Sequence, residues 1–283
     1  MYTSIRQSLL SCCTKPLDQG RYQNILWELS DTFPCCQLHT IGTSPQGHSI
    51  YAVSLGGEGE LRSVAYIGGI DGRDWISTAI LLRFVADYCI LHQDGERLYR
   101  VHLPYLYANR RICICPRFNC DGAEAVKNGE KDAGCRNSLG ADIHTAFETL
   151  EHSGSDTARC PEALALRQYL QYQSPSLLMT LFGCSTASTH GTDNENKEST
   201  LLLPRHPSSR TGTVGRLLSR MLSCSLTEAV SVQEPNTALI NWFADTQGHP
   251  AFSAVLGLEA EEDGFYRGYA SSREALFSLP LLV

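Results

Sequence analysis

The chain has 283 residues, of which 42% are hydrophobic and 19% are charged, and its formal net charge at pH 7 is −7. This length allows a large buried core, and the composition is that of an ordinary globular protein rather than a disordered chain. The acidic balance argues against nucleic acid or an anionic membrane surface as a partner.

The organisation of the chain indicates one domain, covering residues 1–283, because the sequence shows no internal repeat and no Pro-rich or Gly/Ser-rich linker. Residues 1–15 contain only the short apolar pair Leu9-Leu10, whereas a signal peptide needs about 7–15 apolar residues. No run approaches the roughly 20 apolar residues of a membrane span. We therefore expect a cytoplasmic protein without a membrane segment, whose 12 cysteines are reduced and packed.

Hydrophobic periodicity predicts helices that alternate with short apolar strands. The predicted helices cover residues 22–33, 76–91, 160–172, 212–224 and 271–279. The predicted strands cover residues 38–42, 49–56, 63–67, 111–115, 176–181 and 252–258. Nearly continuous apolar strands that alternate with helices predict an α/β fold, with a mixed, mostly parallel sheet covered by helices on both faces.

Three short segments lie where predicted strands run into loops. Residues 68–78 read GGIDGRDWIST and contain Asp71 and Asp74; residues 177–183 read LLMTLFG and contain Phe182; residues 250–257 read PAFSAVLG and contain Val255. Functional loops of parallel sheets lie beyond the carboxyl ends of the strands. We therefore expect these three segments to meet at one edge of the sheet.

These segments, taken with IGTSPQGHSI at 41–50, RFNCDG at 117–122 and CRNSLGADIHTAF at 135–147, give the chain its resemblance to a known family. Their order and spacing resemble the zinc carboxypeptidases, and most nearly the bacterial γ-D-glutamyl-diamino-acid peptidases. The resemblance spans almost the whole chain. It implies a carboxypeptidase-like fold, a zinc ion held by His-x-x-Glu and a later His, and a Glu that acts as general base.

The chain departs from the family at each of these functional positions. Asp71 and Asp74 stand where the resemblance places the His and Glu ligands, Phe182 replaces the second His, and Val255 replaces the catalytic Glu. Two aspartates suit a hard cation better than zinc, and a phenyl ring offers no ligand. The sequence therefore predicts no bound zinc and no peptidase activity, which would make the protein a pseudoenzyme.

Three further positions correspond to substrate recognition in the family. His144 and Thr145 stand at the positions that bind the carboxylate end of the substrate, and Arg136 stands near the position of an oxyanion-polarising Arg. The resemblance implies that the former cleft binds a peptide or a protein partner. The sequence does not indicate the oligomeric state.

Several alternatives stay open at this point. A peptidase or amidase for cell-wall-type peptides could use a divalent ion held by Asp71, Asp74 and His144, with a hard cation bound weakly by the two aspartates. The former cleft could instead be filled by side chains in a purely structural role. Two other routes to activity would use Cys184 as a nucleophile with His144 or His190, or Glu259 or Glu261 as the base after a shift of the last strand.

Overall fold

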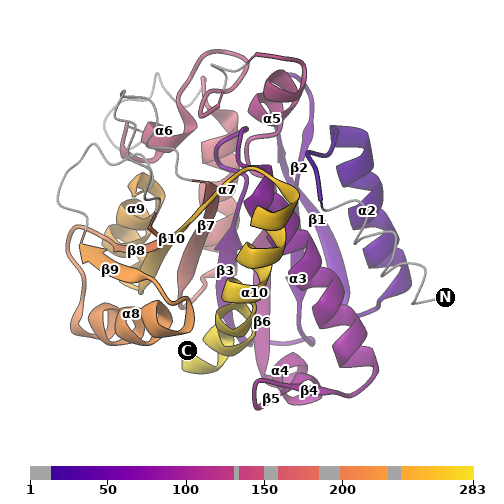
Figure 1. Ribbon diagram of the computed structural model, residues 1–283, viewed down its shortest axis with the longest axis vertical. Helices are drawn as coiled ribbons and strands as arrows, with labels where there is room; N and C mark the ends of the chain where they lie inside the picture. Colours follow the sequence, from indigo (N-terminus) through magenta and orange to yellow (C-terminus); the bar gives the residue numbers. More distant parts are fainter. Residues whose placement is uncertain (1–13, 131–133, 150–158, 185–197, 229–236) are drawn as a thin grey trace.

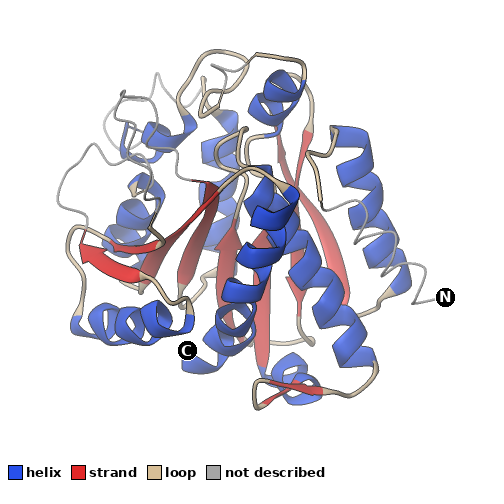
Figure 2. Ribbon diagram, in the orientation of Figure 1, coloured by secondary structure: helices blue, strands red, loops and turns tan. Residues whose placement is uncertain are grey.

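The computed structural model describes residues 14–130, 134–149, 159–184, 198–228 and 237–283. Among them, eight strands form one mixed sheet, and helices cover both of its faces (Figure 1, Figure 2). In spatial order these strands are β1 (Cys36–Thr43), β2 (Ser49–Leu55), β6 (Arg110–Cys115), β3 (Arg62–Ile67), β7 (Leu178–Cys184), β10 (Ala251–Leu258), β8 (Thr200–Leu203) and β9 (Ser225–Glu228).

The centre of this sheet is parallel, as the apolar strands predict. The pairs β6–β3, β3–β7 and β7–β10 are parallel, as is β8–β9 near the edge. The pairs β1–β2, β2–β6 and β10–β8 are antiparallel. Because β3, β7 and β10 run side by side in the same direction, their carboxyl ends bring the three motif segments to one edge.

One face of the sheet is covered by α2 (Gln19–Thr32), α3 (Trp75–Gln93), α8 (Ser209–Met221) and α10 (Glu262–Ser278). The other face carries α6 (Ile143–Thr149), α7 (Pro161–Gln173) and α9 (Ala238–Gln247). Each face has its own apolar core. Shorter elements complete the described fold: α4 (Leu103–Asn109), α5 (Cys120–Lys127), the 3-10 helix η2 (Leu279–Leu282), and the small hairpin of β4 (Arg97–Leu98) and β5 (Val101–His102).

Helix α3 is the central element of the first core. By length and composition it could cross a membrane, but thirteen of its residues are buried inside the protein. The Phe84 ring lies edge-on to Phe277 with centroids 4.8 Å apart, and it also packs against Tyr66 at 5.8 Å. This degree of burial accounts for an almost uniformly apolar helix without an exposed polar face.

A buried charge ties α3 to α10. Asp87 accepts hydrogen bonds from Arg83 at 2.9 Å and from the hydroxyl of Tyr269 at 2.8 Å, and its carboxylate also pairs with Arg273 at 3.1 Å. A buried carboxylate without partners would be strongly destabilising, so these contacts fix the packing of the two helices as well as satisfying the charge.

The sequence prediction is confirmed for the fold class and for most of the long elements, with end shifts of up to three residues, except that α10 begins at Glu262, nine residues before its predicted start. The short elements were not predicted: α4, α5, α6, α9, β4, β5, β8, β9 and η2. Cys113 and Cys115, which alternate in β6, are both buried, and the nine cysteines whose side chains are described are free thiols. The polar sequence of residues 189–199, THGTDNENKES, indicates a surface loop, but most of it lies outside the described residues.

The aromatic packing around α3 gives a stability prediction. Replacing Phe84, which is fully buried, with Ala should lower the free energy of unfolding by about 3–5 kcal/mol, because it removes a large ring and leaves a cavity. Chemical denaturation measures this loss. The matched control is Tyr172→Ala, since Tyr172 is 85% exposed and its removal should change stability by less than about 0.5 kcal/mol. Equal effects of the two substitutions would contradict the assignment of the core.

Candidate functional site

The candidate site begins where β3 ends and the chain turns through Gly68 and Gly69. Gly69 has a φ of 58°, and a Cβ there would lie 2.7 Å from Thr78 Oγ1 and 2.9 Å from the Cα of Arg117. A side chain would therefore be strained both by the backbone conformation and by its neighbours. This tight turn places Asp71 and Asp74 just before the first turn of α3.

Asp71 is fully buried, and its partners come from its own loop and from Cys135. Its carboxylate accepts hydrogen bonds from Arg73 Nη2 at 2.6 Å, from the Arg73 backbone N–H at 2.8 Å, and from the thiol of Cys135 at 3.1 Å. Burial acts to raise the pKa of this carboxyl, but the hydrogen bonds and charge of Arg73 and the thiol bond outweigh burial, so the pKa lies below its usual value. Asp71 is thus an ionised carboxylate with internal partners.

Asp74 joins two elements of the fold. Its Oδ1 accepts the backbone N–H of Ser77 at 3.1 Å and so caps helix α3, while its Oδ2 accepts the backbone N–H of Gly183, in β7, at 3.0 Å. Burial raises the pKa of Asp74 to about 6, in spite of these two bonds. Both oxygens are therefore directed at backbone groups.

Phe182 and Val255 lie side by side beneath this loop. They face each other in the register of the parallel strands β7 and β10, and both belong to the apolar core of the second face. Phe182 is 1% exposed and Val255 is 8% exposed, and the ring of His144 lies 5.6 Å from that of Phe182. The structure therefore brings Phe182, Val255 and His144 together, and it links them to Asp74 through Gly183.

The space beside the two aspartates is almost filled. The crevice lined by Asp71, Asp74, Arg117 and their neighbours has a volume of about 10 Å³. A single water needs roughly 10–15 Å³. Leu17, which precedes α2, lines the same crevice, and its carbonyl accepts a hydrogen bond from Arg117 Nη2 at 2.9 Å. The crevice beside the two aspartates thus has room for about one water.

The donor set present does not fit zinc. Structural and catalytic zinc sites use three or four nitrogen, sulfur or carboxylate ligands. Here one carboxylate is paired with Arg73, the other caps a helix and binds β7, and the third position is a phenyl ring. Within the described part of the chain, no group of three or more His, Cys, Asp or Glu side chains is arranged to hold a metal ion.

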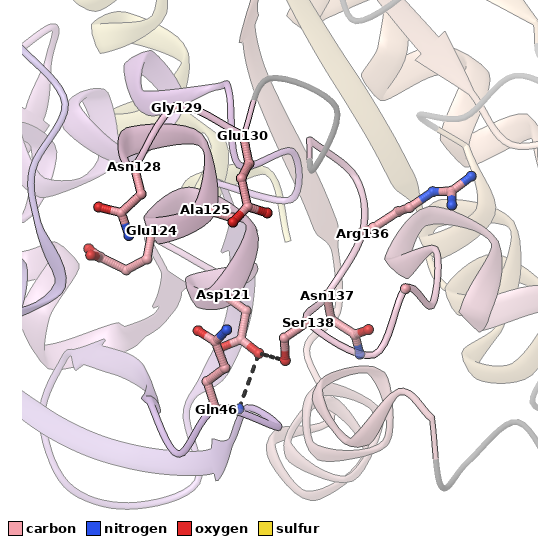
Figure 3. Close-up of a pocket in the computed structure, with 11 residues that line it drawn as sticks. Gln46, Asp121, Glu124, Ala125, Asn128, Gly129, Glu130, Arg136, Asn137 and Ser138 are labelled. Atoms are coloured by element: carbon pink, nitrogen blue, oxygen red, sulfur yellow. Dashed lines mark hydrogen bonds between the residues drawn. The ribbon is translucent and has the colours of Figure 1, made fainter.

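Two of the three residues that the resemblance assigns to substrate recognition lie beside open space. Arg136 is exposed, and it lines a pocket of about 850 Å³ between α5 and the loop at 134–140. Figure 3 shows its guanidinium directed away from Asp121 and Glu124. Thr145 is exposed and lines a neighbouring hollow of about 210 Å³, and Gly140 lines both spaces. His144, by contrast, is buried.

Asp121 organises the floor of the larger pocket, and sequence reasoning did not identify it. It is buried, and it accepts hydrogen bonds from the hydroxyls of Ser44 and Ser138, the latter at 2.6 Å, and from the backbone N–H of Gln46 at 3.2 Å (Figure 3). Its Oδ1 also lies 3.0 Å from His48 Nδ1. The only sequence signal was its place in the RFNCDG segment, which gives no indication of such a cross-link.

The other two routes to activity find no support among the described residues. Glu259 and Glu261 are exposed beyond the end of β10, while Val255 keeps its register opposite Phe182. The side chain of Cys184 and the whole of His190 lie outside the described residues, so the nucleophile hypothesis stays an untested prediction.

Comparison with known proteins identifies the family to which this chain belongs. The model of the zinc carboxypeptidase family matches residues 22–199. Mouse carboxypeptidase M is 25% identical over 177 residues, which are 59% of this chain and 38% of that protein. Gamma-D-glutamyl-L-diamino acid endopeptidase 1 of Lysinibacillus sphaericus is 26% identical over 112 residues, 40% of this chain and 28% of that one. The chain thus spans about a third of the length of the curated relatives it matches.

Solved structures share the fold at lower identity. A metallo-carboxypeptidase from Burkholderia cenocepacia aligns with a TM-score of 0.70 and 14% identity, over 95% of this chain and 70% of that one. Bovine thrombin-activatable fibrinolysis inhibitor, solved in complex with tick carboxypeptidase inhibitor, aligns with a TM-score of 0.70 and 13% identity, over 95% and 97% of the two chains. At this identity the likeness shows the fold alone.

The raised pKa of Asp74 predicts a specific pH dependence. In the unfolded chain this carboxyl ionises near pH 4, whereas in the folded protein it holds its proton until about pH 6. The native state therefore binds more protons between these values, so stability should fall as pH rises from 4 to 6, by about 3 kcal/mol from this group. Asp71, whose pKa is lowered, acts in the opposite direction and below this window.

Urea unfolding of the wild type and of Asp74→Asn at several pH values measures this dependence. The difference between the two curves should slope between pH 4 and 6 and be flat from pH 6 to 8. Burial also raises the pKa of Glu162, but that contribution is present in both proteins and cancels in the difference. A flat difference across the whole range would show that Asp74 ionises normally.

Proposed function

Because the chain belongs to the zinc carboxypeptidase family, we propose that it is a family member that has lost zinc and peptidase activity and keeps the fold for binding. The observation that carries the proposal is the engagement of Asp74. Both of its oxygens bind backbone N–H groups, and one of these groups belongs to Gly183, the residue after Phe182. A carboxylate that holds the fold together in this way is not available to a metal ion.

The loss of catalysis follows from the chemistry of water. Without a metal, the pKa of water stays near ~15.7 instead of falling to about 7. At roughly 1.36 kcal/mol per pKa unit, that difference corresponds to over 10 kcal/mol. Val255 cannot accept a proton, and it is packed against the apolar core. Both the nucleophile and its base are therefore missing in this proposal.

The binding part of the proposal rests on a contrast between two halves of the former cleft. Asp71 and Asp74 line a crevice of about 10 Å³, whereas Arg136 and Thr145 line spaces of about 850 and 210 Å³. Pockets that bind small ligands commonly measure about 300–1,000 Å³. We place a peptide or a segment of a partner protein in this remaining space.

We also propose that the protein is cytoplasmic, where the nine described free thiols would stay reduced.

The alternative function is a peptidase that uses another divalent ion at Asp71, Asp74 and His144. It would require Asp71 to exchange Arg73 for a cation, although Arg73 is held at 2.6 Å and its pKa is raised by this same bond. It would also require His144 to leave its contact with Phe182. These requirements favour the proposal without activity.

Metal content and turnover test the first part of the proposal. We expect substoichiometric zinc after dialysis against micromolar zinc, and no cleavage of C-terminal peptide or γ-D-glutamyl substrates with zinc, manganese, magnesium or calcium. Asp71→Asn and Asp74→Asn should leave these results unchanged. One tightly bound zinc per chain, or turnover that disappears in Asp74→Asn, would overturn the proposal in favour of the metal-dependent alternative.

The binding part is tested separately by calorimetric titration with a γ-D-glutamyl-L-diamino acid dipeptide, whose chemistry is that named for the Lysinibacillus relative. We expect binding without cleavage, and an affinity at least tenfold weaker in Ser138→Trp, because the indole would fill the pocket that Ser138 lines. Tyr172→Ala is the control and should bind as the wild type does, because Tyr172 is exposed at the end of α7 away from the residues that line the pocket. Absence of binding, or equal binding by Ser138→Trp, would refute this placement.

A further inference from the structure

A short strap, residues 16–19, leads into α2 and forms one wall of the crevice at Asp71 and Asp74. Pro16 and Leu17 line that crevice, as does Trp75 from the start of α3. Leu17 is 6% exposed, whereas Pro16 before it is exposed. Because Leu17 is part of the wall, any movement of the strap away from the protein would widen the space beside the two aspartates.

The strap is seated on a buried guanidinium. Arg117 is 2% exposed, and its Nη2 donates to the carbonyl of Leu17 at 2.9 Å, while its Nη1 donates to Oε1 of Gln19 at 3.5 Å. Its Cζ also lies 4.4 Å from the ring centroid of Tyr22, in the first turn of α2. The ion pairs of the described residues do not include Arg117. A buried cation without a carboxylate depends on such partners, so the strap and Arg117 hold each other in place.

The other end of the strap is latched to helix α5. The backbone N–H of Gln19 donates to Glu124 Oε1 at 2.5 Å, and Asp18 pairs with Lys127 at 3.3 Å. The side chains of Asp18 and Lys127 are 47% and 39% exposed, and an ion pair so exposed adds little stability. The bond to Glu124 is therefore the main attachment of the strap to α5. Glu124 also lines the large pocket.

The strap has the features of a segment that opens locally. Of its four residues only Leu17 and Gln19 are buried, and the latch on Glu124 is half-buried. Segments with few buried contacts and partly exposed hydrogen bonds open without unfolding the rest of a protein. The strap can therefore leave its seat while the two apolar cores stay intact.

We propose that residues 16–19 are a releasable strap that closes the crevice beside Asp71 and Asp74, with Arg117 as its seat and Glu124 as its latch. Release widens the crevice and exposes Trp75. Because seat and latch hold the two ends of one short segment, the loss of either one loosens the other. Helix α5 thus carries both a wall of the large pocket and the latch. The inference is independent of the proposed loss of zinc, because the contacts that hold the strap involve neither aspartate.

The first experiment removes the latch and reads the crevice. Glu124→Ala takes away the acceptor of the Gln19 N–H, and Glu124 does not itself line the crevice. Hydroxyl-radical footprinting of the folded full chain should then show Trp75 oxidised about threefold faster, with Trp27, which is 47% exposed, as an unchanged internal reference. Glu124→Gln keeps an acceptor oxygen for the Gln19 N–H and should behave as the wild type does.

The second experiment removes the seat and reads the latch. In Arg117→Met we expect hydrogen exchange of the Gln19 amide to be about tenfold faster, which reports a tenfold larger population of the open strap. The matched control is Arg111→Met, because Arg111 also donates to two backbone carbonyls, those of Gly57 and Gly59, and should leave the exchange unchanged. Leu17→Ala removes the seated side chain and provides the same test where Arg117→Met does not fold.

Two kinds of result would overturn the proposal. Unchanged oxidation of Trp75 in Glu124→Ala, or unchanged exchange of the Gln19 amide in the seat variants, would show that the two ends are independent contacts. Equal increases in Glu124→Gln and Glu124→Ala, or in Arg111→Met and Arg117→Met, would show a general loosening of the fold instead of the release of the strap.

Discussion

The bond between Asp74 and the backbone of Gly183 is the constraint on which the site depends. It joins the loop after β3 to strand β7, and the other oxygen of the same carboxylate caps α3, the central helix of the larger core. A Cβ on Gly183 would lie 2.6 Å from Ile76 and 2.9 Å from Asp74 Oδ1, so the two elements meet too closely for a side chain there. The carboxylate therefore serves the packing of β7 and α3.

This constraint is consistent with the apolar residues that lie beside it. With Asp74 turned toward the backbone, Phe182 and Val255 extend the apolar core of the second face up to the carboxyl ends of their strands. Apolar residues at such positions avoid the cost of burying polar groups without partners. Arg73 neutralises Asp71 within the same loop. The apolar pair of Phe182 and Val255 thus lies in the packed core, while Arg136 and Thr145 line open space.

The sequence predicted the long elements and the meeting of the three motif segments, because apolar periodicity and strand order carry that information. It could not predict the partners of Asp71 and Asp74. Cys135 and Gly183 are more than sixty residues away from them, and Asp121 joins a turn, a helix and a loop through hydrogen bonds that have no periodic signal. Contacts between segments so far apart in the sequence form only when the fold places their strands and loops side by side.

The central claim is that the position of the former zinc site is now part of the packed interior. Crystals grown with excess zinc, measured on both sides of the zinc absorption edge, test it most directly. The account predicts no anomalous difference peak within bonding distance of Asp71 or Asp74, with Asp74 still bound to Gly183 and Ser77. A strong peak between the two aspartates, with Asp74 turned away from Gly183, would contradict it.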